Sequence, residues 1–168
     1  MVKITPHIIL GIDPGIADTG FGVIEENRGQ LKLVAYGSIK TNKKDELSIR
    51  LLELHQQLAK IIDKYQPELA VVEQLFFCTN VKTALIVGQA RGTILLTLAQ
   101  SKTKIAELTP LQVKQGLTGY GQADKKQIQQ MVKIILNLKT IPKPDDAADA
   151  LAVAMARFHK YMENEIEE

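Results

Sequence analysis

The chain has 168 residues, of which 45% are hydrophobic and 24% charged, a balance typical of a globular protein. A chain of this length buries roughly 70% of its unfolded surface, so its core needs neither disulfides nor a structural metal. The single cysteine, Cys78, excludes an internal disulfide and favours a reducing compartment, the cytoplasm. No apolar run reaches the ~18 residues of a membrane span, and the first residues lack a secretory signal. We expect one domain over 1–168, with an acidic tail that frays from about residue 160.

The net charge of +2 hides a segregation of charge along the chain. Residues 102–143 carry eight lysines against two acidic residues, whereas residues 144–168 carry two basic residues against seven acidic ones. A lysine-rich segment suits a polyanion and clustered carboxylates suit a metal cation, so the pattern indicates phosphate chemistry with a divalent ion. Two solvated helix faces would produce the same pattern, and on charge alone that is the simpler interpretation.

The first forty residues predict a three-stranded meander. Residues 7–13 form a short apolar run typical of a buried strand, and a glycine-rich turn leads to a second strand over 21–26. A turn over 27–29 precedes a third strand over 31–39. Because the connections are short, we expect these strands to pair antiparallel.

Helices and strands alternate from residue 45 onward. An apolar stripe predicts a helix that Pro67 ends, and Thr79 or Asn80 is the expected N-cap of the next helix. A short helix opened by Thr109 should break at Gly116, and Asp145 is the expected N-cap of the final, alanine-rich helix. The predicted helices cover 45–65, 79–100, 110–114, 124–138 and the segment after 145, and the predicted strands cover 69–76 and 103–108. This alternation predicts parallel pairing of the later strands and an α/β fold.

Four acidic residues stand where a soluble fold normally avoids them. Asp13 ends an apolar strand, and Glu73 interrupts another. Asp146 and Asp149 open the alanine-rich helix, three residues apart and therefore on one face. Burial of an isolated carboxylate costs several kcal/mol, and a shared cation would remove that cost. Oxygen ligands without His or Cys select Mg²⁺ or Mn²⁺, and two such ions about 4 Å apart can activate a water and stabilise the leaving 3′ oxygen of a phosphodiester.

Each acid also has a purely structural interpretation. Asp13 could be a turn residue before Pro14, Asp146 could interact with the helix dipole, and Glu73 could form a salt bridge. The interpretation is weakest for Glu73, because its neighbours on both sides are apolar.

Five collinear strings, IILGIDPG…TGFG, VVEQLFF, GQARG, QVKQ and DDAADALAVA, resemble the RuvC-type Holliday junction resolvases of bacteria over residues 8–158. The resemblance implies an RNase H-like α/β fold, with a five-stranded mixed sheet flanked by helices on both faces. It implies a homodimeric endonuclease that resolves four-way DNA junctions in recombination and repair by paired symmetric nicks with 5′-phosphate and 3′-hydroxyl ends. It further implies two Mg²⁺ per active site, replaceable by Mn²⁺, and coupling to the RuvA and RuvB branch-migration proteins.

The resemblance also assigns residues. It makes Asp13, Glu73, Asp146 and Asp149 the catalytic metal ligands, although Asp145, also on the face of Asp149, could replace Asp146. The DNA-binding residues that it implies are Phe76, or its neighbour Phe77, for base stacking, and Lys114 and Lys125 beside the phosphates. Gln74 and Arg91 lie in matching strings and are assigned only possible backbone or supporting contacts.

Ala84, Gly88 and Gly92 form a small-residue stripe on the helix predicted over 79–100. The stripe could pack on its own sheet, or it could contact a second subunit of the dimer that symmetric incision requires.

Three rival functions remain open. The GIDPGIADTG turn resembles the first phosphate loop of actin-like ATPases, but those proteins need a second lobe that this chain is too short to supply. An RNase H-like nuclease of the YqgF type would act on RNA, and the QVKQ and AADALA strings argue against it. A junction-binding scaffold without catalysis is disfavoured because four metal-free acids repel DNA.

Overall fold

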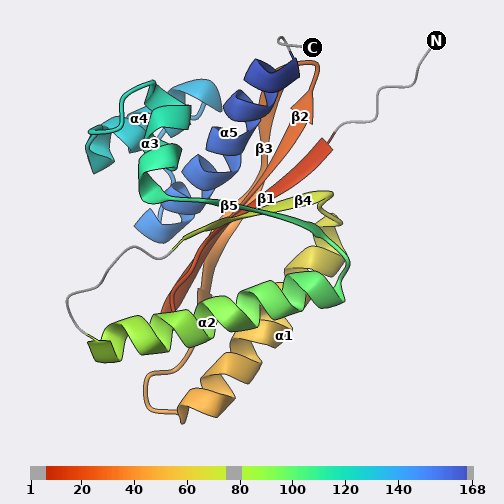
Figure 1. Cartoon of the computed structure of the whole chain (residues 1–168), viewed down its shortest axis with the longest axis vertical. Helices are drawn as coiled ribbons and strands as arrows, with labels where there is room; N and C mark the ends of the chain where they lie inside the picture. Colours follow the sequence, from red (N-terminus) through yellow and green to blue (C-terminus); the bar gives the residue numbers. More distant parts are fainter. Residues whose placement is uncertain (1–6, 75–80, 166–168) are drawn as a thin grey trace.

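The structure, a computed structural model, describes residues 7–74 and 81–165, and only the backbone over 159–165. Its five strands form one mixed sheet in the order β3-β2-β1-β4-β5, with helices on both faces (Figure 1). The elements are β1 His7–Asp13, β2 Asp18–Asn27, β3 Gln30–Lys40, α1 Leu47–Tyr65, β4 Leu69–Glu73, α2 Val81–Gln100, β5 Lys104–Leu108, α3 Pro110–Thr118, α4 Lys125–Ile135 and α5 Asp145–Glu165. The predicted order of strands and helices and the mixed sheet are confirmed.

The meander of β1, β2 and β3 is antiparallel, as predicted. Asn27 pairs with Gln30, so the turn between β2 and β3 has only two central residues, Arg28 and Gly29. Both have positive φ, 52° and 81°, which is the conformation of the two-residue turns that match the twist of a hairpin. This turn fixes how β3 begins to pair with β2. On the other side of β2, Gly20 lies opposite Asp13 of β1.

The later strands pair parallel, β1 with β4 and β4 with β5, because α1 and α2 carry the chain back across one face of the sheet. Helix α1 ends at Tyr65, and its C-cap Gln66, directly before Pro67, has a left-handed φ of 49°. In these parallel pairs β1, β4 and β5 all end at the same edge, with Asp13 and Glu73 as the last residues of the first two.

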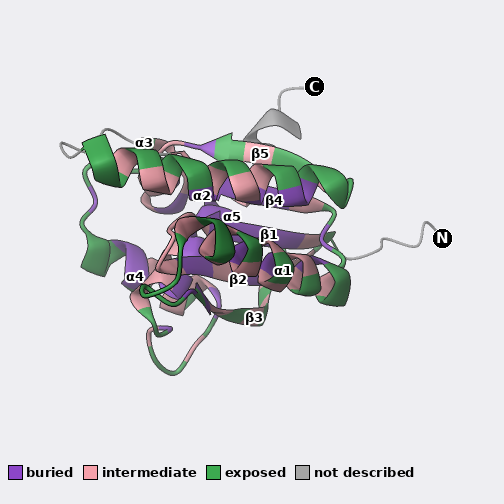
Figure 2. Cartoon of the chain, turned by 90° about the horizontal axis from the view of Figure 1, so that it is seen from below, coloured by how far each residue is buried: buried purple, intermediate pink, exposed green. Residues whose placement is uncertain are grey.

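The core has two layers, one on each side of the sheet. Leu10, Ile12 and Val72 are fully buried against α1 and α2, whereas Ile9 and Val71 lie in the cluster that includes α5. Figure 2 shows the buried residues concentrated in the central strands and α5, with exposed residues on the outer faces of α1 and α2. Since side chains alternate along a strand, Asp13 and Glu73, each one residue after a side chain on the α1–α2 face, point to the α5 face.

Several predicted boundaries are wrong. The strand predicted over 69–76 ends at Glu73, and the helix predicted over 124–138 ends at Ile135. Helix α3 does not break at Gly116 but continues to Thr118, because Gly116 packs against Ala156 of α5 and its missing side chain is used for contact. Asp145 is the first residue of α5 and not its N-cap, since the amides of Ala147 and Ala148 donate to the carbonyl of Pro144. Helix α5 extends to Glu165, into the segment expected to fray, and residues 166–168 lie outside the described residues.

Candidate active site

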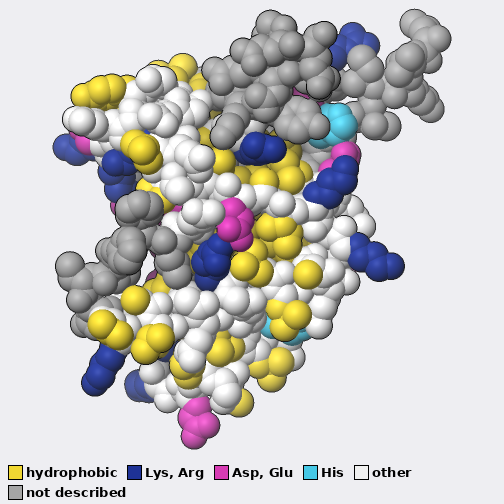
Figure 3. Space-filling view, viewed as in Figure 1, with side chains coloured by type: hydrophobic (Ala, Val, Ile, Leu, Met, Phe, Trp, Pro, Cys, Tyr) yellow, Lys and Arg dark blue, Asp and Glu magenta, His cyan; other side chains and the backbone are white. Residues whose placement is uncertain are grey.

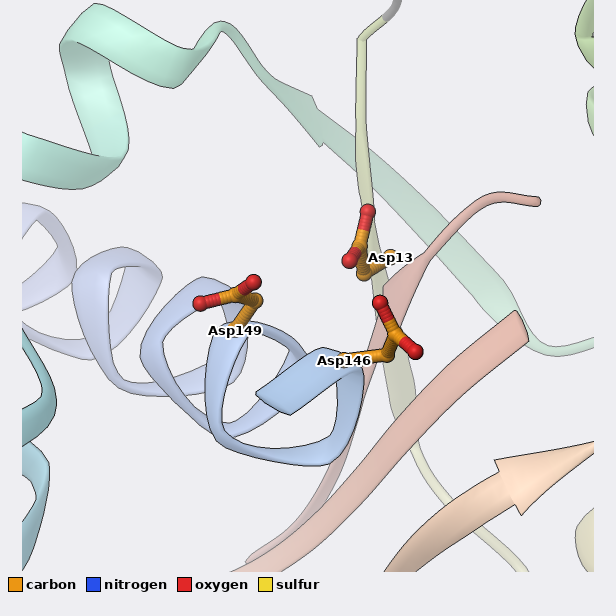
Figure 4. A group of neighbouring side chains, drawn as sticks. All are labelled: Asp13, Asp146 and Asp149. Atoms are coloured by element: carbon orange, nitrogen blue, oxygen red, sulfur yellow. The ribbon is translucent and has the colours of Figure 1, made fainter. Parts of the chain in front are cut away.

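Three of the four predicted acids meet above the end of β1. Figure 4 shows Asp13 on its strand facing Asp146 and Asp149, which come from the first turns of α5. One carboxylate oxygen from each of the three lies within 4.8 Å of the others, a spacing that a bound cation could bridge. Sites 133 residues apart in the chain are thereby joined at one edge of the sheet.

Close packing of α5 on glycines brings these acids together. A Cβ atom at Gly20 of β2 would overlap the backbone oxygen of Asp146, and one at Gly11 of β1 would overlap the backbone oxygen of Ala150. Only a residue without a side chain permits this approach of helix backbone to strand backbone. Gly20, in the TGFG string, therefore has a structural role: it sets the distance of Asp146 from the sheet.

Glu73 completes the cluster from the neighbouring strand. It is outside the three-residue group within 4.8 Å, yet its side chain hydrogen-bonds that of Asp13. It is the last residue of β4 and not an interior residue of a longer strand, so its carboxylate reaches the edge of the sheet. All four predicted ligands thus lie at one place.

Burial and mutual repulsion make this cluster resist ionisation. Desolvation, followed by the charge of Glu73, raises the pKa of Asp13 from 3.8 to about 8. Desolvation and the charge of Asp149 also raise the pKa of Glu73, which Lys114 opposes. Carboxyls this crowded hold a proton at neutral pH unless a cation replaces it. The electrostatics therefore favour a cation site.

Both predicted lysines lie at the cluster. Lys114 of α3 is close enough to Glu73 to lower the pKa of that carboxyl. The Nζ of Lys125 lies 3.0 Å from Oδ2 of Asp149 and 3.6 Å from Oδ2 of Asp145. Burial works against a charged Lys125, but the hydrogen bond and charge of Asp149 raise its pKa.

Asp145 forms ion pairs with two lysines. Besides Lys125, it accepts a hydrogen bond of 2.7 Å from Nζ of Lys143, and this contact lowers its pKa. The residue within 4.8 Å of both Asp13 and Asp149 is Asp146. Between the two alternatives left open by the sequence, the geometry favours Asp146 as the ligand.

Gln74 and Arg91 also meet, through a residue that the sequence analysis missed. Arg91 Nη2 lies 2.6 Å from Oε1 of Glu107, and Nε2 of Gln74 donates to Oε2 of the same carboxylate at 3.2 Å. Glu107 could have been noticed as one of only two acids in the lysine-rich segment, but nothing in its local pattern identifies its partners.

The remaining sequence predictions have different outcomes. Phe76 and Phe77 lie outside the described residues, so their stacking role stays a prediction. Gly88 and Gly92 are exposed and a Cβ at either would meet no atom within 4 Å, so neither glycine packs on the sheet of its own chain, whereas Ala84 is half-buried. Across the described ranges, 7–74 and 81–165, the longest helices are too polar or too short to cross a bilayer.

Comparison with known proteins identifies the family. The family model of crossover junction endodeoxyribonuclease RuvC matches residues 9–157. The RuvC of Caldicellulosiruptor saccharolyticus is 56% identical over 151 residues, which cover 89% of this chain and 91% of that protein. The RuvC of Halothermothrix orenii is 52% identical over 157 residues, which cover 94% and 95%.

Solved structures agree. Thermus thermophilus RuvC is 32% identical with a TM-score of 0.87, covering 94% of this chain and 96% of that one. The T. thermophilus RuvC in complex with a Holliday junction substrate is 30% identical with a TM-score of 0.84 and the same coverage. These likenesses confirm the RNase H-like α/β fold, and this chain belongs to the RuvC family of crossover junction endodeoxyribonucleases.

Proposed function

We propose that this protein resolves four-way DNA junctions by metal-dependent hydrolysis of one phosphodiester in each of two opposed strands. The observation that carries the proposal is the convergence of Asp13, Asp146 and Asp149 within 4.8 Å, with Glu73 hydrogen-bonded to Asp13. Membership of an endonuclease family and the junction bound by the T. thermophilus relative support the substrate. A pure binding protein would gain nothing from acids that repel DNA.

The residues present fit a divalent cation. Four carboxylates without a His or Cys partner form a hard oxygen site, for which Mg²⁺ is the proposed ion and Mn²⁺ a substitute. Asp13, Glu73, Asp146 and Asp149 would hold it, and Asp13, between Glu73 on one side and α5 on the other, is the proposed shared ligand. A bound ion of this kind lowers the pKa of water and neutralises charge on the scissile phosphate.

The lysines are proposed to receive the DNA. Lys114 and Lys125 flank the acids on α3 and α4, where their ammonium groups can pair with phosphate oxygens on either side of the cut. In the absence of DNA these lysines interact with carboxylates of the cluster, so a DNA phosphate that binds them would replace a carboxylate as their partner. Junction affinity should therefore fall with salt in proportion to the number of phosphates neutralised.

A homodimer is the proposed assembly, with α2 at its interface. Val81, Leu85 and Leu96 are 71%, 64% and 58% exposed on this helix. With Gly88 and Gly92 they recur at spacings of three and four residues, which is one face of a helix. Hydrophobic side chains follow α2 across the lower half of the view in Figure 3, with charged ones mainly at the edges. A second copy related by a two-fold axis would cover this apolar face and supply the second active site.

The test is cleavage of an end-labelled mobile four-way junction with Mg²⁺ by the wild type, Glu73→Gln and Glu68→Gln. Glu73→Gln keeps the size of the ligand and removes its charge, whereas Glu68→Gln removes a carboxylate at the other end of β4, where it pairs with His7. We expect symmetric nicks from the wild type and Glu68→Gln, and cutting reduced by about 100-fold or more, with binding retained, for Glu73→Gln.

Three outcomes would contradict the proposal. Tight binding without cutting by the wild type in Mg²⁺ or Mn²⁺ supports a scaffold, and absence of both supports an RNA substrate. Equal loss of cutting in Glu73→Gln and Glu68→Gln would mean that the acidic cluster has no special role.

A further inference from the structure

Glu107 of β5 connects helix α2 to the end of β4 through its side chain. One carboxylate oxygen binds Arg91 of α2 at 2.6 Å and the other accepts from Gln74, which follows directly on Glu73, at 3.2 Å. The side chains of Arg91 and Glu107 are only 23% and 32% exposed. Both oxygens of Glu107 are therefore occupied, and neither partner can be lost without leaving a partly buried polar group unpaired.

This contact lies behind the acidic cluster, on the opposite face of the sheet. Glu73 is in register with Leu108, which is buried in the core beside α5, and Val72 is in register with Glu107. Because side chains alternate along a strand, Glu73 faces α5 while Gln74 and Glu107 face α2. Figure 3 shows acidic and basic side chains in contact over β5, near the centre of this face.

Backbone and side-chain contacts together fix the position of the chain at Glu73. The amide of Gln74 donates to the carbonyl of Leu108 at 2.8 Å, which is the last backbone bond between β4 and β5, and its side chain then binds Glu107. Arg91 in turn holds Glu107, while the buried Nε of Arg91 has no hydrogen-bond partner among the described residues. The ion pair at Nη2 is thus the polar contact described for this guanidinium, and an ion pair that is partly buried is weak evidence for a contribution to stability.

We propose that Glu107, clamped between Arg91 and Gln74, is a positioning residue for the metal site, holding the end of β4 so that Glu73 meets Asp13. This inference rests on the proposed metal-dependent function. Partners that orient metal ligands commonly contribute about 10- to 100-fold to metal affinity, although they never touch the ion. The same contact ties the metal site to α2, the helix proposed to form the dimer.

The test measures Mn²⁺ binding to the whole protein by the electron paramagnetic resonance signal of free Mn²⁺, without DNA or cleavage. The variants are Glu107→Ala, Arg91→Met, the double variant, and Glu68→Gln as a control that breaks a carboxylate contact at the opposite end of β4. We expect the Mn²⁺ dissociation constant to rise about tenfold in Glu107→Ala and less in Arg91→Met, where Gln74 keeps its acceptor. The double variant, which leaves no unpaired charge, should match Glu107→Ala, because both single changes act through one contact.

Single-turnover cleavage then separates positioning from general damage. In Glu107→Ala the Mg²⁺ concentration for half-maximal cleavage should rise in step with the Mn²⁺ constant, and saturating Mg²⁺ should restore most of the rate. Glu107→Asp, which keeps both oxygens on a shorter side chain, should recover part of the affinity.

The inference is overturned if Glu107→Ala binds Mn²⁺ as the wild type does while its melting temperature falls, or if the effects of the two single variants add. A wild type that fails to bind Mn²⁺ would instead overturn the proposed metal site.

Discussion

The two faces of the sheet are covered in different ways. On one face, α5 lies so close to β1 and β2 that glycines must stand beneath it, and it contributes two of the four acids. On the other face, α1 and α2 pack through leucine and isoleucine side chains, and the outer side of α2 exposes apolar residues. Backbone contact fixes the distance of α5 from the sheet, whereas the α1–α2 face is held by side chains, which can repack. The proposed metal site and the proposed dimer interface thus lie on opposite faces of the sheet.

The strongest test of this difference between the two faces is to add one methyl group on each face. Gly20→Ala would overlap the backbone of Asp146, so we expect a loss of about 3 kcal/mol or more in the free energy of unfolding and loss of cleavage. Gly92→Ala meets no atom within the subunit and should stabilise α2 by roughly 0.5–1 kcal/mol. Urea unfolding at a concentration where the chain is monomeric measures both. Similar losses in the two variants would contradict the comparison.

Protonation of the acidic cluster provides the second largest effect. Because the pKa of Asp13 is raised from 3.8 to about 8, the folded, metal-free protein holds a proton that the unfolded chain releases, and stability should fall as pH rises from about 4 to 8. The slope for this one group cannot exceed about 1.4 kcal/mol per pH unit. Asp13→Asn should flatten the dependence and raise the melting temperature at pH 8. Adding Mg²⁺ should stabilise the wild type increasingly as pH rises. If Asp13→Asn kept the pH dependence of stability of the wild type, that dependence would not arise from Asp13.

Charge on the α2 face should affect assembly without affecting the fold. Leu85→Lys places an ammonium group in the proposed dimer interface, and we expect the dimer dissociation constant to rise by roughly 10- to 100-fold. Ile49→Lys is the matched control, since Ile49 of α1 is 52% exposed on the same side of the sheet. Sedimentation equilibrium distinguishes them. An unchanged dimer in Leu85→Lys would remove α2 from the interface.

The smallest expected effect concerns Lys125. Its ammonium group, 3.0 Å from Asp149, competes with a metal for that carboxylate, so Lys125→Met should bind Mn²⁺ about threefold more tightly. Its cleavage at saturating metal should nevertheless be slower, because a phosphate partner is lost. Lys126→Met removes the same charge one residue away. Equal changes in both variants would mean that net charge, and not the contact with Asp149, sets the affinity.

The sequence predicted what depends on local pattern and on residue type. Apolar pattern, capping residues and alanine content together located each strand and helix of the described residues. The cost of burying a carboxylate identified Glu73, although its strand was predicted too long. Contacts between distant segments were not predictable in this way. Gly116 was expected to break a helix because glycine does so locally, but contact with α5 overrides that tendency. Glu107 was missed because its partners lie 16 and 33 residues away, at distances that only the packed sheet defines.

The acids are distributed over 136 residues of sequence, with Asp13 in the first strand and Asp146 and Asp149 in the last helix. During synthesis, a nascent chain that has not yet released α5 carries only half of the cluster. If the four acids form the proposed metal site, that site can be complete only after the final helix has packed on β1 and β2. A fragment that ends before residue 146 lacks two of the four proposed ligands and the helix that covers one face of the sheet, so we expect it neither to fold nor to cut DNA.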